Sequence, residues 1–352
     1  MEIDAYVLVT PGKPLERRSL ELPPPGPGEV LVEVSACGLC HTDLSYARGA
    51  VAPRHPTPLV LGHEIVGRVV GAGATQEALV GHRVLVPAVL PCGECPFCAA
   101  GRGNACPTQK MPGNDVHGGF ATHVMVPGAP LVRLDSVPSA VEPRHLSVVA
   151  DAVSTAYQAT VRAGLQPGDV AFVVGAGGVG GYVLQIAHAM GARAVALDVD
   201  PDRLARVSSH GAERALLVRD RPARDVRREA HKLAAEWGIP SLRYRIFECS
   251  GTPQGQLLAF TLLAQAATLV QAGYCASPVE LRLSNVMAFD ATVHGTWGCP
   301  PAAYPAVLRM IYEGKIELSP FVTEAPLSRV NELLDDMEHH RLTTRIVFDP
   351  RA

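Results

Sequence analysis

The spacing of apolar residues predicts a β-rich region at the start of the chain. Residues 29–38 (EVLVEVSACG) and 66–70 (VGRVV) gather β-branched residues in short runs, and glycine- and proline-rich stretches such as 22–30 (LPPPGPGEV) separate such runs. Short apolar runs bounded by turn-forming residues are typical of strands joined by turns. We therefore expect residues 1 to about 90 to form several short strands.

A different pattern begins after about residue 150. Residues 171–174 (AFVV) predict a short buried strand, residues 179–190 (VGGYVLQIAHAM) space their apolar side chains as a helix does, and residues 194–198 (AVALD) predict the next strand. The region continues with a charged amphipathic helix at 224–238 and predicted strands at 241–251 and 267–275. Alternating strands and helices are typical of a doubly wound parallel sheet, so we expect an α/β fold. The last fifty or so residues mix short helices and strands and end on a predicted strand, 345–348.

Composition and charge limit the partners that the chain is expected to have. The chain has 352 residues, which suits two domains of ordinary size, and a formal net charge of −3. A nearly neutral chain predicts neither nucleic acid nor an anionic membrane surface as a partner. The first residues (MEIDAYVLVT) lack the pattern of a signal peptide, and no apolar stretch is long enough to span a bilayer. We therefore expect a cytoplasmic protein, and its nine cysteines then argue for metal binding or catalysis rather than disulfides.

Four of these cysteines lie within residues 91–107 (PCGECPFCAAGRGNACP). Their spacing, C-x2-C-x2-C-x7-C, lets four thiolates converge on one zinc ion from a single tight loop. Four thiolates also saturate the ion, so we expect a structural rather than a catalytic zinc. Free cysteines or a disulfide pair are the alternatives. The predicted ligands are Cys92, Cys95, Cys98 and Cys106.

A glycine-rich turn follows the first predicted strand of the α/β region. It has the pattern G-x-G-x-x-G, with a helix after it and an acid, Asp198, at the end of the next strand. This context is typical of dinucleotide binding, and the carboxylate favours NAD over NADP because it repels a 2′-phosphate. The alternative is a packed βαβ unit that binds no nucleotide. The predicted contacts are Gly175, Gly177, Gly178, Val179, Gly180 and Asp198.

A second set of metal-binding residue types stands nearer the N-terminus. Residues 37–44 (CGLCHTDL) contain Cys40, and residues 62–67 (GHEIVG) contain His63. Taken singly, these two are more often a buried thiol and a core histidine. Their occurrence together with a zinc lobe and an NAD fold favours a second metal site.

With these motifs in this order, the chain resembles the zinc-dependent medium-chain alcohol dehydrogenases over nearly its whole length. The resemblance implies a β-rich GroES-like catalytic domain at 1–152, completed by 298–352, and a Rossmann NAD-binding domain at 153–297. It implies two zinc ions per subunit, one structural and one catalytic. It further implies that Cys40 and His63 bind the catalytic zinc and that Glu64 lies beside it.

The third zinc ligand of the catalytic site is where the chain departs from many members of the family. Those members have a cysteine where residues 149–158 (VADAVSTAYQ) place Asp151. One thiolate and one carboxylate still neutralise Zn²⁺, and three protein ligands leave a position for substrate. The alternative is that Asp151 caps the helix that follows it. We favour the ligand role because the zinc would otherwise keep two strong protein ligands.

The resemblance also assigns roles in hydride and proton transfer. Zinc would acidify the bound alcohol, and NAD would accept its hydride. Thr42 would contact the substrate oxygen and begin a proton relay, which many relatives end on a histidine where this chain has Ser45. His41 and Arg345 match residues that contact the pyrophosphate, and Arg203 matches a basic residue near the adenosine ribose. A solvated surface charge is the alternative for each of these three.

Several blocks resemble one branch of the family, the 6-hydroxycyclohex-1-ene-1-carbonyl-CoA dehydrogenases. The blocks are 109–124, 148–159, 246–252, 281–291 and 297–299. The implied substrate is a cyclic allylic alcohol or its ketone, carried as a CoA thioester. The alternatives are a general secondary-alcohol or polyol dehydrogenase, a cyclic enone reductase without CoA, and a catalytically silent NAD-binding protein. Residues 291–299 match a strand that relatives pair across a dimer, so we expect a homodimer or homotetramer.

Overall fold

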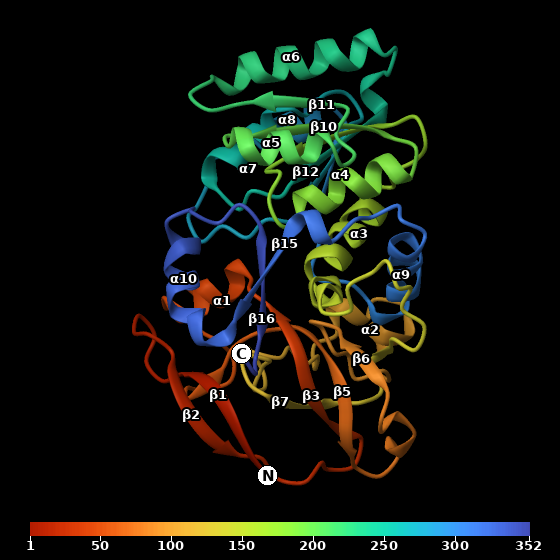
Figure 1. Cartoon of the computed structure of the whole chain (residues 1–352). Coiled ribbons are helices and arrows are strands. Elements are labelled where there is room, and N and C mark those ends of the chain that lie inside the picture. Colours follow the sequence, from red (N-terminus) through yellow and green to blue (C-terminus); the bar gives the residue numbers. More distant parts are fainter. The chain divides into compact units, whose positions relative to one another are not determined.

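The computed structural model describes residues 1–352, which form two compact units (Figure 1). The N-terminal unit comprises Met1–Ser154, Gly298–Tyr312 and Phe321–Ala352, and the central unit comprises Thr155–Trp297 and Glu313–Pro320. The sequence interpretation placed 313–320 with the N-terminal unit. In the structure this segment belongs to the central unit, where the side-chain amide of Gln185 exchanges two hydrogen bonds with the backbone of Glu317, at 2.8 and 3.2 Å.

The N-terminal unit is built on two sheets. The larger sheet has the strand order β15 (Val322–Pro326), β16 (Arg345–Asp349), β3 (Glu29–Gly38), β5 (Glu64–Ala72), β6 (Arg83–Val86) and β8 (Val132–Arg133), with β7 (His123–Pro127) also paired to β3. The smaller sheet has the order β2 (Glu16–Glu21), β1 (Glu2–Leu8) and β4 (Leu59–Val60). The strands predicted at 29–38, 66–70 and 345–348 are therefore confirmed.

Short helices lie between the strands along the chain. They are α1 (His41–Ala47), α2 (Pro96–Ala99), α9 (Tyr304–Tyr312) and α10 (Val330–Glu338), with 3₁₀ turns that include η3 (His145–Ala150). Helix α3 (Ala152–Arg162) begins in this unit and continues into the central one. His63 lies immediately before β5, and Asp151 lies immediately after η3. The ends of these two elements therefore position two of the predicted zinc ligands.

The central unit contains one parallel sheet of six strands. Its order is β11 (Arg214–Leu217), β10 (Arg193–Asp198), β9 (Val170–Val174), β12 (Tyr244–Glu248), β13 (Thr268–Gln271) and β14 (Thr292–Gly295). Its helices are α4 (Gly180–Ala189), α5 (Pro201–Ser208), α6 (Ala223–Glu236), α7 (Pro253–Thr261) and α8 (Ser284–Ala288). In chain order this arrangement is 3-2-1-4-5-6, the order of dinucleotide-binding folds. The predicted doubly wound α/β fold is confirmed.

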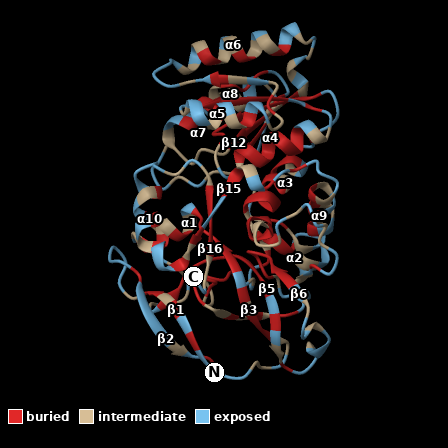
Figure 2. Ribbon diagram, viewed as in Figure 1, coloured by how far each residue is buried: buried red, intermediate tan, exposed pale blue.

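The core of the central unit follows from the apolar pattern of its strands and helices. All five residues of β9 are buried, and the ring of Phe172 packs edge-on against Tyr244 at 5.2 Å between centroids. Helix α6 buries Val226, Ala230 and Ala234, which recur every fourth residue on one face (Figure 2). Burying a side chain the size of phenylalanine contributes about 1.5–3 kcal/mol. None of the helices combines the length and the apolar content needed to span a bilayer.

Candidate functional site

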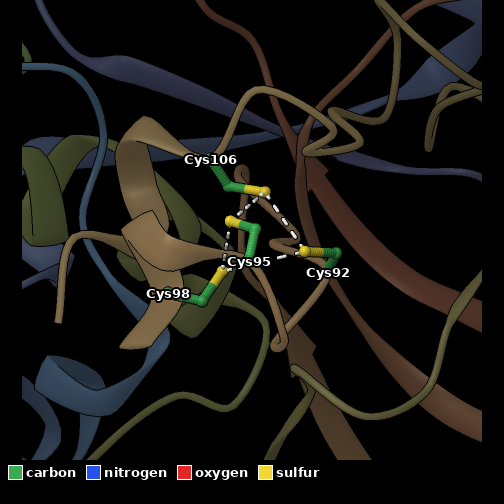
Figure 3. A group of neighbouring side chains, drawn as sticks. All are labelled: Cys92, Cys95, Cys98 and Cys106. Atoms are coloured by element: carbon green, nitrogen blue, oxygen red, sulfur yellow. Dashed lines mark hydrogen bonds between the residues drawn. The ribbon is translucent and has the colours of Figure 1, made fainter. Parts of the chain in front are cut away.

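The four cysteines of residues 92–106 come together in a surface lobe (Figure 3). Their sulfur atoms lie 3.5 Å (Cys95 to Cys98), 3.6 Å (Cys106 to Cys92), 3.7 Å (Cys95 to Cys106) and 3.9 Å (Cys92 to Cys98) apart. Four thiolates around a tetrahedral zinc ion, each about 2.3 Å away, would be separated by about 3.8 Å. The side chains therefore fit zinc, and they form no disulfide.

Local backbone structure explains why these sulfurs converge. Cys95 precedes helix α2, with proline at its first turn, and the left-handed conformations of Gly93 and Gly101 reverse the chain on either side. The backbone N–H of Glu94 is the largest of several donors that lower the pKa of Cys92 to about 6. Burial and the contact with Cys95 raise the pKa of Cys98 in the same lobe to about 11, so the fit to zinc rests on the sulfur distances.

The second predicted set, Cys40, His63 and Asp151, also converges, within the N-terminal unit. The Oδ2 atom of Asp151 lies 3.5 Å from Nε2 of His63 and 3.8 Å from Sγ of Cys40. Around a tetrahedral zinc, a nitrogen and an oxygen ligand would lie about 3.4 Å apart, and a sulfur and an oxygen ligand about 3.6 Å apart. Cys40 stands immediately before α1, His63 before β5 and Asp151 between η3 and α3. The carboxylate of Asp151 thus faces two ligand atoms rather than only its own helix.

A buried carboxylate that the sequence reasoning missed completes this set. Asp43 is fully buried and accepts hydrogen bonds from the backbone N–H groups of Cys40 and Gly62, both at 3.0 Å. Its Oδ1 atom lies 3.3 Å from Nδ1 of His63. A carboxylate behind a metal-binding histidine fixes the ring and its tautomer. Its only signal in the sequence is an acid three residues after Cys40, which an ordinary helix start would also have.

The electrostatics of the cluster favour a cation at its centre. Both ring nitrogens of His63 are buried without a well-oriented hydrogen-bond partner. Burial lowers the pKa of His63, but the charges of Asp43 and Cys40 and the contact with Asp151 outweigh burial and raise the pKa well above its usual value. A group of donors that attracts a proton so strongly also suits a divalent metal ion. The residues therefore fit zinc.

Glu64 lies beside this cluster and is held by Arg345. The carboxylate is fully buried, and the guanidinium of Arg345 donates to it twice, at 2.8 and 2.5 Å. The backbone N–H of Ala152, next to Asp151, donates to the same carboxylate at 3.0 Å. Arg345 is therefore not a solvated surface charge. Its contact with a pyrophosphate, and any contact of Glu64 with zinc, stay predictions.

The residues predicted to handle the substrate proton lie on helix α1. The hydroxyl of Thr42 is 3.7 Å from Sγ of Cys40, so it lies beside the metal cluster. His41 is exposed at the first position of the helix. The hydroxyl of Ser45 donates to the carbonyl oxygen of His41 at 2.9 Å. Ser45 is thus engaged within its own helix, and the group that ends the proton relay stays open.

The glycine turn of the central unit has the geometry that dinucleotide binding needs. Gly175 has φ +90°, and a Cβ atom there would lie 2.6 Å from the backbone nitrogen of Ser250. A Cβ on Gly180 would lie 1.8 Å from the carbonyl oxygen of Gly175. Beside Gly177 the nearest atom to such a Cβ is a guanidinium nitrogen of Arg203, 3.9 Å away. The turn is therefore closed on the protein side and open at its second glycine, as a bound pyrophosphate requires.

Asp198 connects this turn to the next strand. It ends β10, is 4% exposed, and accepts hydrogen bonds from the backbone N–H groups of Ala176 (2.6 Å) and Asp200 (2.9 Å). Arg203, on α5, has its Nε atom 3.7 Å from Asp200. The predicted ribose-binding acid and the predicted basic residue therefore both adjoin the glycine turn. Their contacts with NAD stay predictions.

A second missed acid, Glu248, shapes the loop that backs the turn. It ends β12, is fully buried, and accepts from the backbone N–H of Ser250 (2.8 Å), the hydroxyl of Ser250 (2.5 Å) and the side chain of Gln271 (2.7 Å). Because Ser250 touches Gly175, Glu248 supports the turn through that loop. The sequence places Glu248 at a strand end but does not show which groups will donate hydrogen bonds to it.

Comparison with known proteins identifies the family. The sequence profile of the alcohol dehydrogenase GroES-like domain matches residues 26–136, and that of the zinc-binding dehydrogenase domain matches residues 178–313. An alcohol dehydrogenase of Geobacillus stearothermophilus is 30% identical over 339 residues, covering 96% of each chain. The chain belongs to the zinc-dependent medium-chain alcohol dehydrogenase family. The L-galactonate-5-dehydrogenase of Escherichia coli (strain K12), 30% identical over 88% of each chain, is another relative.

Solved structures of alcohol dehydrogenases share the fold. The cobalt- and zinc-bound thermostable alcohol dehydrogenase of Pyrobaculum aerophilum has a TM-score of 0.84 and 27% identity, covering 99% of this chain and 100% of that one. A structure described as an NAD-dependent alcohol dehydrogenase has a TM-score of 0.86 and 26% identity, covering 98% and 99%. This family member is thus an NAD- and zinc-dependent oxidoreductase that acts on small-molecule alcohols, with its metal and glycine motifs in place.

Proposed function

We propose that this alcohol dehydrogenase oxidises a cyclic, allylic secondary alcohol to the conjugated ketone with NAD, and that its substrate is 6-hydroxycyclohex-1-ene-1-carbonyl-CoA. When bound, NAD would take up the hydride from the alcohol carbon, and the hydroxyl proton would pass to solvent. The observation that carries the dehydrogenase proposal is the convergence of Cys40, His63 and Asp151 within the N-terminal unit. The proposal for the thioester rests on the five sequence blocks that resemble that branch.

Each residue of the site has a role in this proposal. Cys40, His63 and Asp151 would hold the zinc ion, which would polarise the C–O group of the substrate. Asp43 orients the ring of His63 from behind. Thr42, whose hydroxyl lies 3.7 Å from Sγ of Cys40, would accept a hydrogen bond from the substrate hydroxyl and pass its own proton on towards solvent as it takes up the substrate proton. The glycine turn and Asp198 bind NAD.

A second candidate substrate is an open-chain polyol or another secondary alcohol without CoA. The relative named L-galactonate-5-dehydrogenase supports it, since it aligns with 88% of this chain. The two candidates share the zinc chemistry and differ in the remote part of the substrate. A CoA thioester carries phosphates that need cationic side chains, whereas a polyol needs hydrogen-bonding groups.

The deciding experiment measures NADH formation by the purified enzyme with a panel of alcohols. The panel contains the CoA thioester, cyclohex-2-en-1-ol, a plain secondary alcohol and L-galactonate. Fast turnover of the thioester alone supports the first candidate. Turnover of the simple alcohols alone discards the CoA assignment and keeps the zinc mechanism. No turnover of any alcohol by a protein that holds two zinc ions and binds NAD contradicts the proposal.

The role of Thr42 is tested with a matched pair of variants. Thr42→Val removes the hydroxyl but keeps the shape, and we expect turnover to fall about a hundredfold or more, as the loss of a positioned proton acceptor typically does. Thr42→Ser keeps the hydroxyl, so its turnover should stay near wild type. Equal turnover in the two variants would contradict the role of the hydroxyl.

We also propose that the central sheet pairs across a homodimer. Strand β14 is the edge strand of that sheet, and Val293 and Trp297 beside it are 45% and 51% exposed. An edge strand leaves backbone donors and acceptors ready to pair with a second copy. Light scattering during gel filtration tests this. Val293→Pro should give monomers. A wild-type mass equal to that of one chain would contradict the proposed homodimer.

A further inference from the structure

The backbone that carries Asp151 is held by a tyrosine from another segment. The hydroxyl of Tyr304, on α9, donates to the carbonyl oxygen of Ala150 at 2.6 Å, and the backbone N–H of Ala88 donates to the same oxygen at 3.1 Å. Asp151 itself has φ −136° and ψ −66°. It therefore lies outside the regular helical conformation, between the 3₁₀ turn η3 and helix α3. Contacts with its neighbours, rather than a helix, must fix its direction.

A second hydroxyl extends this contact. Oγ of Ser154 lies 3.2 Å from the hydroxyl oxygen of Tyr304, 3.2 Å from the carbonyl oxygen of Asp151 and 3.3 Å from that of Ala150, and Ser154 and Tyr304 are both buried. A hydroxyl has one proton to donate and can accept as well. Since Tyr304 donates its proton to Ala150, its oxygen can accept the proton of Ser154. Each of these contacts ties Ser154, one turn after Asp151, either to Tyr304 or directly to the backbone at 150–151.

The peptide bond on the other side of Asp151 is held independently. The N–H of Ala152 donates to the carboxylate of Glu64 at 3.0 Å. Both peptide units that flank Asp151 are therefore tied to buried side chains that do not belong to η3. This matters more for a carboxylate than for the cysteine of many relatives, because its oxygen is one bond further from the backbone. A small rotation of the backbone moves that oxygen out of reach of Cys40 and His63.

We propose that Tyr304 is a positioning residue for the catalytic metal: with Ser154 it fixes the backbone at 150–152, so that the Asp151 carboxylate stays within ligand distance of Cys40 and His63. This proposal rests on the proposed role of Asp151 as a zinc ligand. In this proposal Tyr304 contacts neither the metal nor the substrate. Outer groups that orient metal ligands typically change metal affinity 10- to 100-fold.

The test is the release of zinc from the full-length enzyme to a chromogenic chelator, which should occur in separate phases for the two sites. In Tyr304→Phe the catalytic-site phase should become about tenfold faster or more, while the phase of the four-cysteine lobe stays unchanged. The absorption spectrum of Co²⁺ bound at the catalytic site should also shift. NADH affinity, which depends on the central unit, should stay within twofold. Tyr182→Phe, which removes a buried hydroxyl from the central unit, is the matched control and should change neither phase.

Further variants decide between the outcomes. Ser154→Ala should also speed the release of zinc from the catalytic site. It tests the proposal by itself if Tyr304→Phe does not fold. Catalytic-site zinc release within twofold of wild type in these variants would overturn the proposal. So would a joint loss of both zinc ions and of NADH affinity, because the hydroxyls would then serve folding in general. If Asp151→Ala leaves zinc release unchanged, the ligand role itself fails; if Asp151→Ala alone speeds it, only the positioning role fails.

Discussion

Arg345 and Glu64 form a two-point ion pair that is buried from water. The guanidinium Nε donates to Oε2 at 2.8 Å and Nη2 donates to Oε1 at 2.5 Å. The pair joins the first residue of β16 to the first residue of β5, next to His63. Oε1 also accepts from the backbone N–H of Ala152, so both of its lone pairs are used, whereas Oε2 keeps one lone pair.

Loss of the arginine should destabilise the protein strongly. Arg345→Met leaves the carboxylate of Glu64 buried without its counter-charge, which typically costs about 3–5 kcal/mol. Urea unfolding measures the change in the free energy of unfolding. Arg329→Met, which removes an exposed partner of Glu332, should cost at most about 1 kcal/mol and serves as control. A value for Arg345→Met as small as that of the control would show that the buried pair contributes little.

The four-cysteine lobe should hold one of two zinc ions. Cys95→Ser removes one of four ligands, and we expect the zinc content to fall from two ions to one per chain, with a lower melting temperature, because the lobe loses its metal crosslink. Elemental analysis after gel filtration measures the content. Cys275→Ser changes a cysteine outside both clusters and should keep two ions. Two zinc ions in purified Cys95→Ser would contradict the assignment.

Asp198 should set the preference for NAD. Asp198→Ala removes the carboxylate that accepts from Ala176 and that would repel a 2′-phosphate. We expect NADH affinity to fall about tenfold or more, which corresponds to about 1.4 kcal/mol, and the ratio of NADPH to NADH affinity to rise. Fluorescence titration with both cofactors measures the two constants. Asp202→Ala, an exposed acid on α5, is the control. An unchanged ratio in Asp198→Ala would contradict this role.

The central unit should lose stability on mild acidification because of His231. Burial is the main cause that lowers the pKa of His231, whose ring lies 5.2 Å from that of Tyr244 and whose Nε2 lies 2.9 Å from the carbonyl oxygen of Leu262. The unfolded chain, with an ordinary pKa of about 6.5, then binds a proton before the folded chain does. This stability is present above pH about 6.5 and is lost as the pH falls through the lowered pKa.

Urea unfolding of wild type and His231→Gln at several pH values tests this prediction. Glutamine can still donate to Leu262 but does not titrate, so the variant should lose less stability than wild type between pH about 7 and about 5. Parallel curves for the two proteins would contradict it. His82→Gln, which changes a half-exposed histidine of the N-terminal unit, controls for the loss of any histidine.

Patterns local in the chain predicted much of this protein. The glycine turn, the order of strands and helices after residue 150 and the four-cysteine lobe each depend on neighbours close in sequence. The resemblance to the family then supplied Cys40, His63 and Asp151 as one set. The sequence could not reveal Tyr304 or the pairing of Glu64 with Arg345, because each acts on residues more than a hundred positions away. Nothing in the residue types alone marks such partners.

The division of the chain also has a consequence for its synthesis. Strand β16 pairs with β3, Val347 opposite Gly38, so the larger N-terminal sheet needs residues that are synthesised long after β3. The central sheet lies wholly within residues 170–295 and can form before those residues emerge. Domains generally fold as units during translation. The central unit should therefore fold first, and the predicted zinc ligands Cys40 and His63 should lie in an incomplete sheet until residues 345–349 have been synthesised.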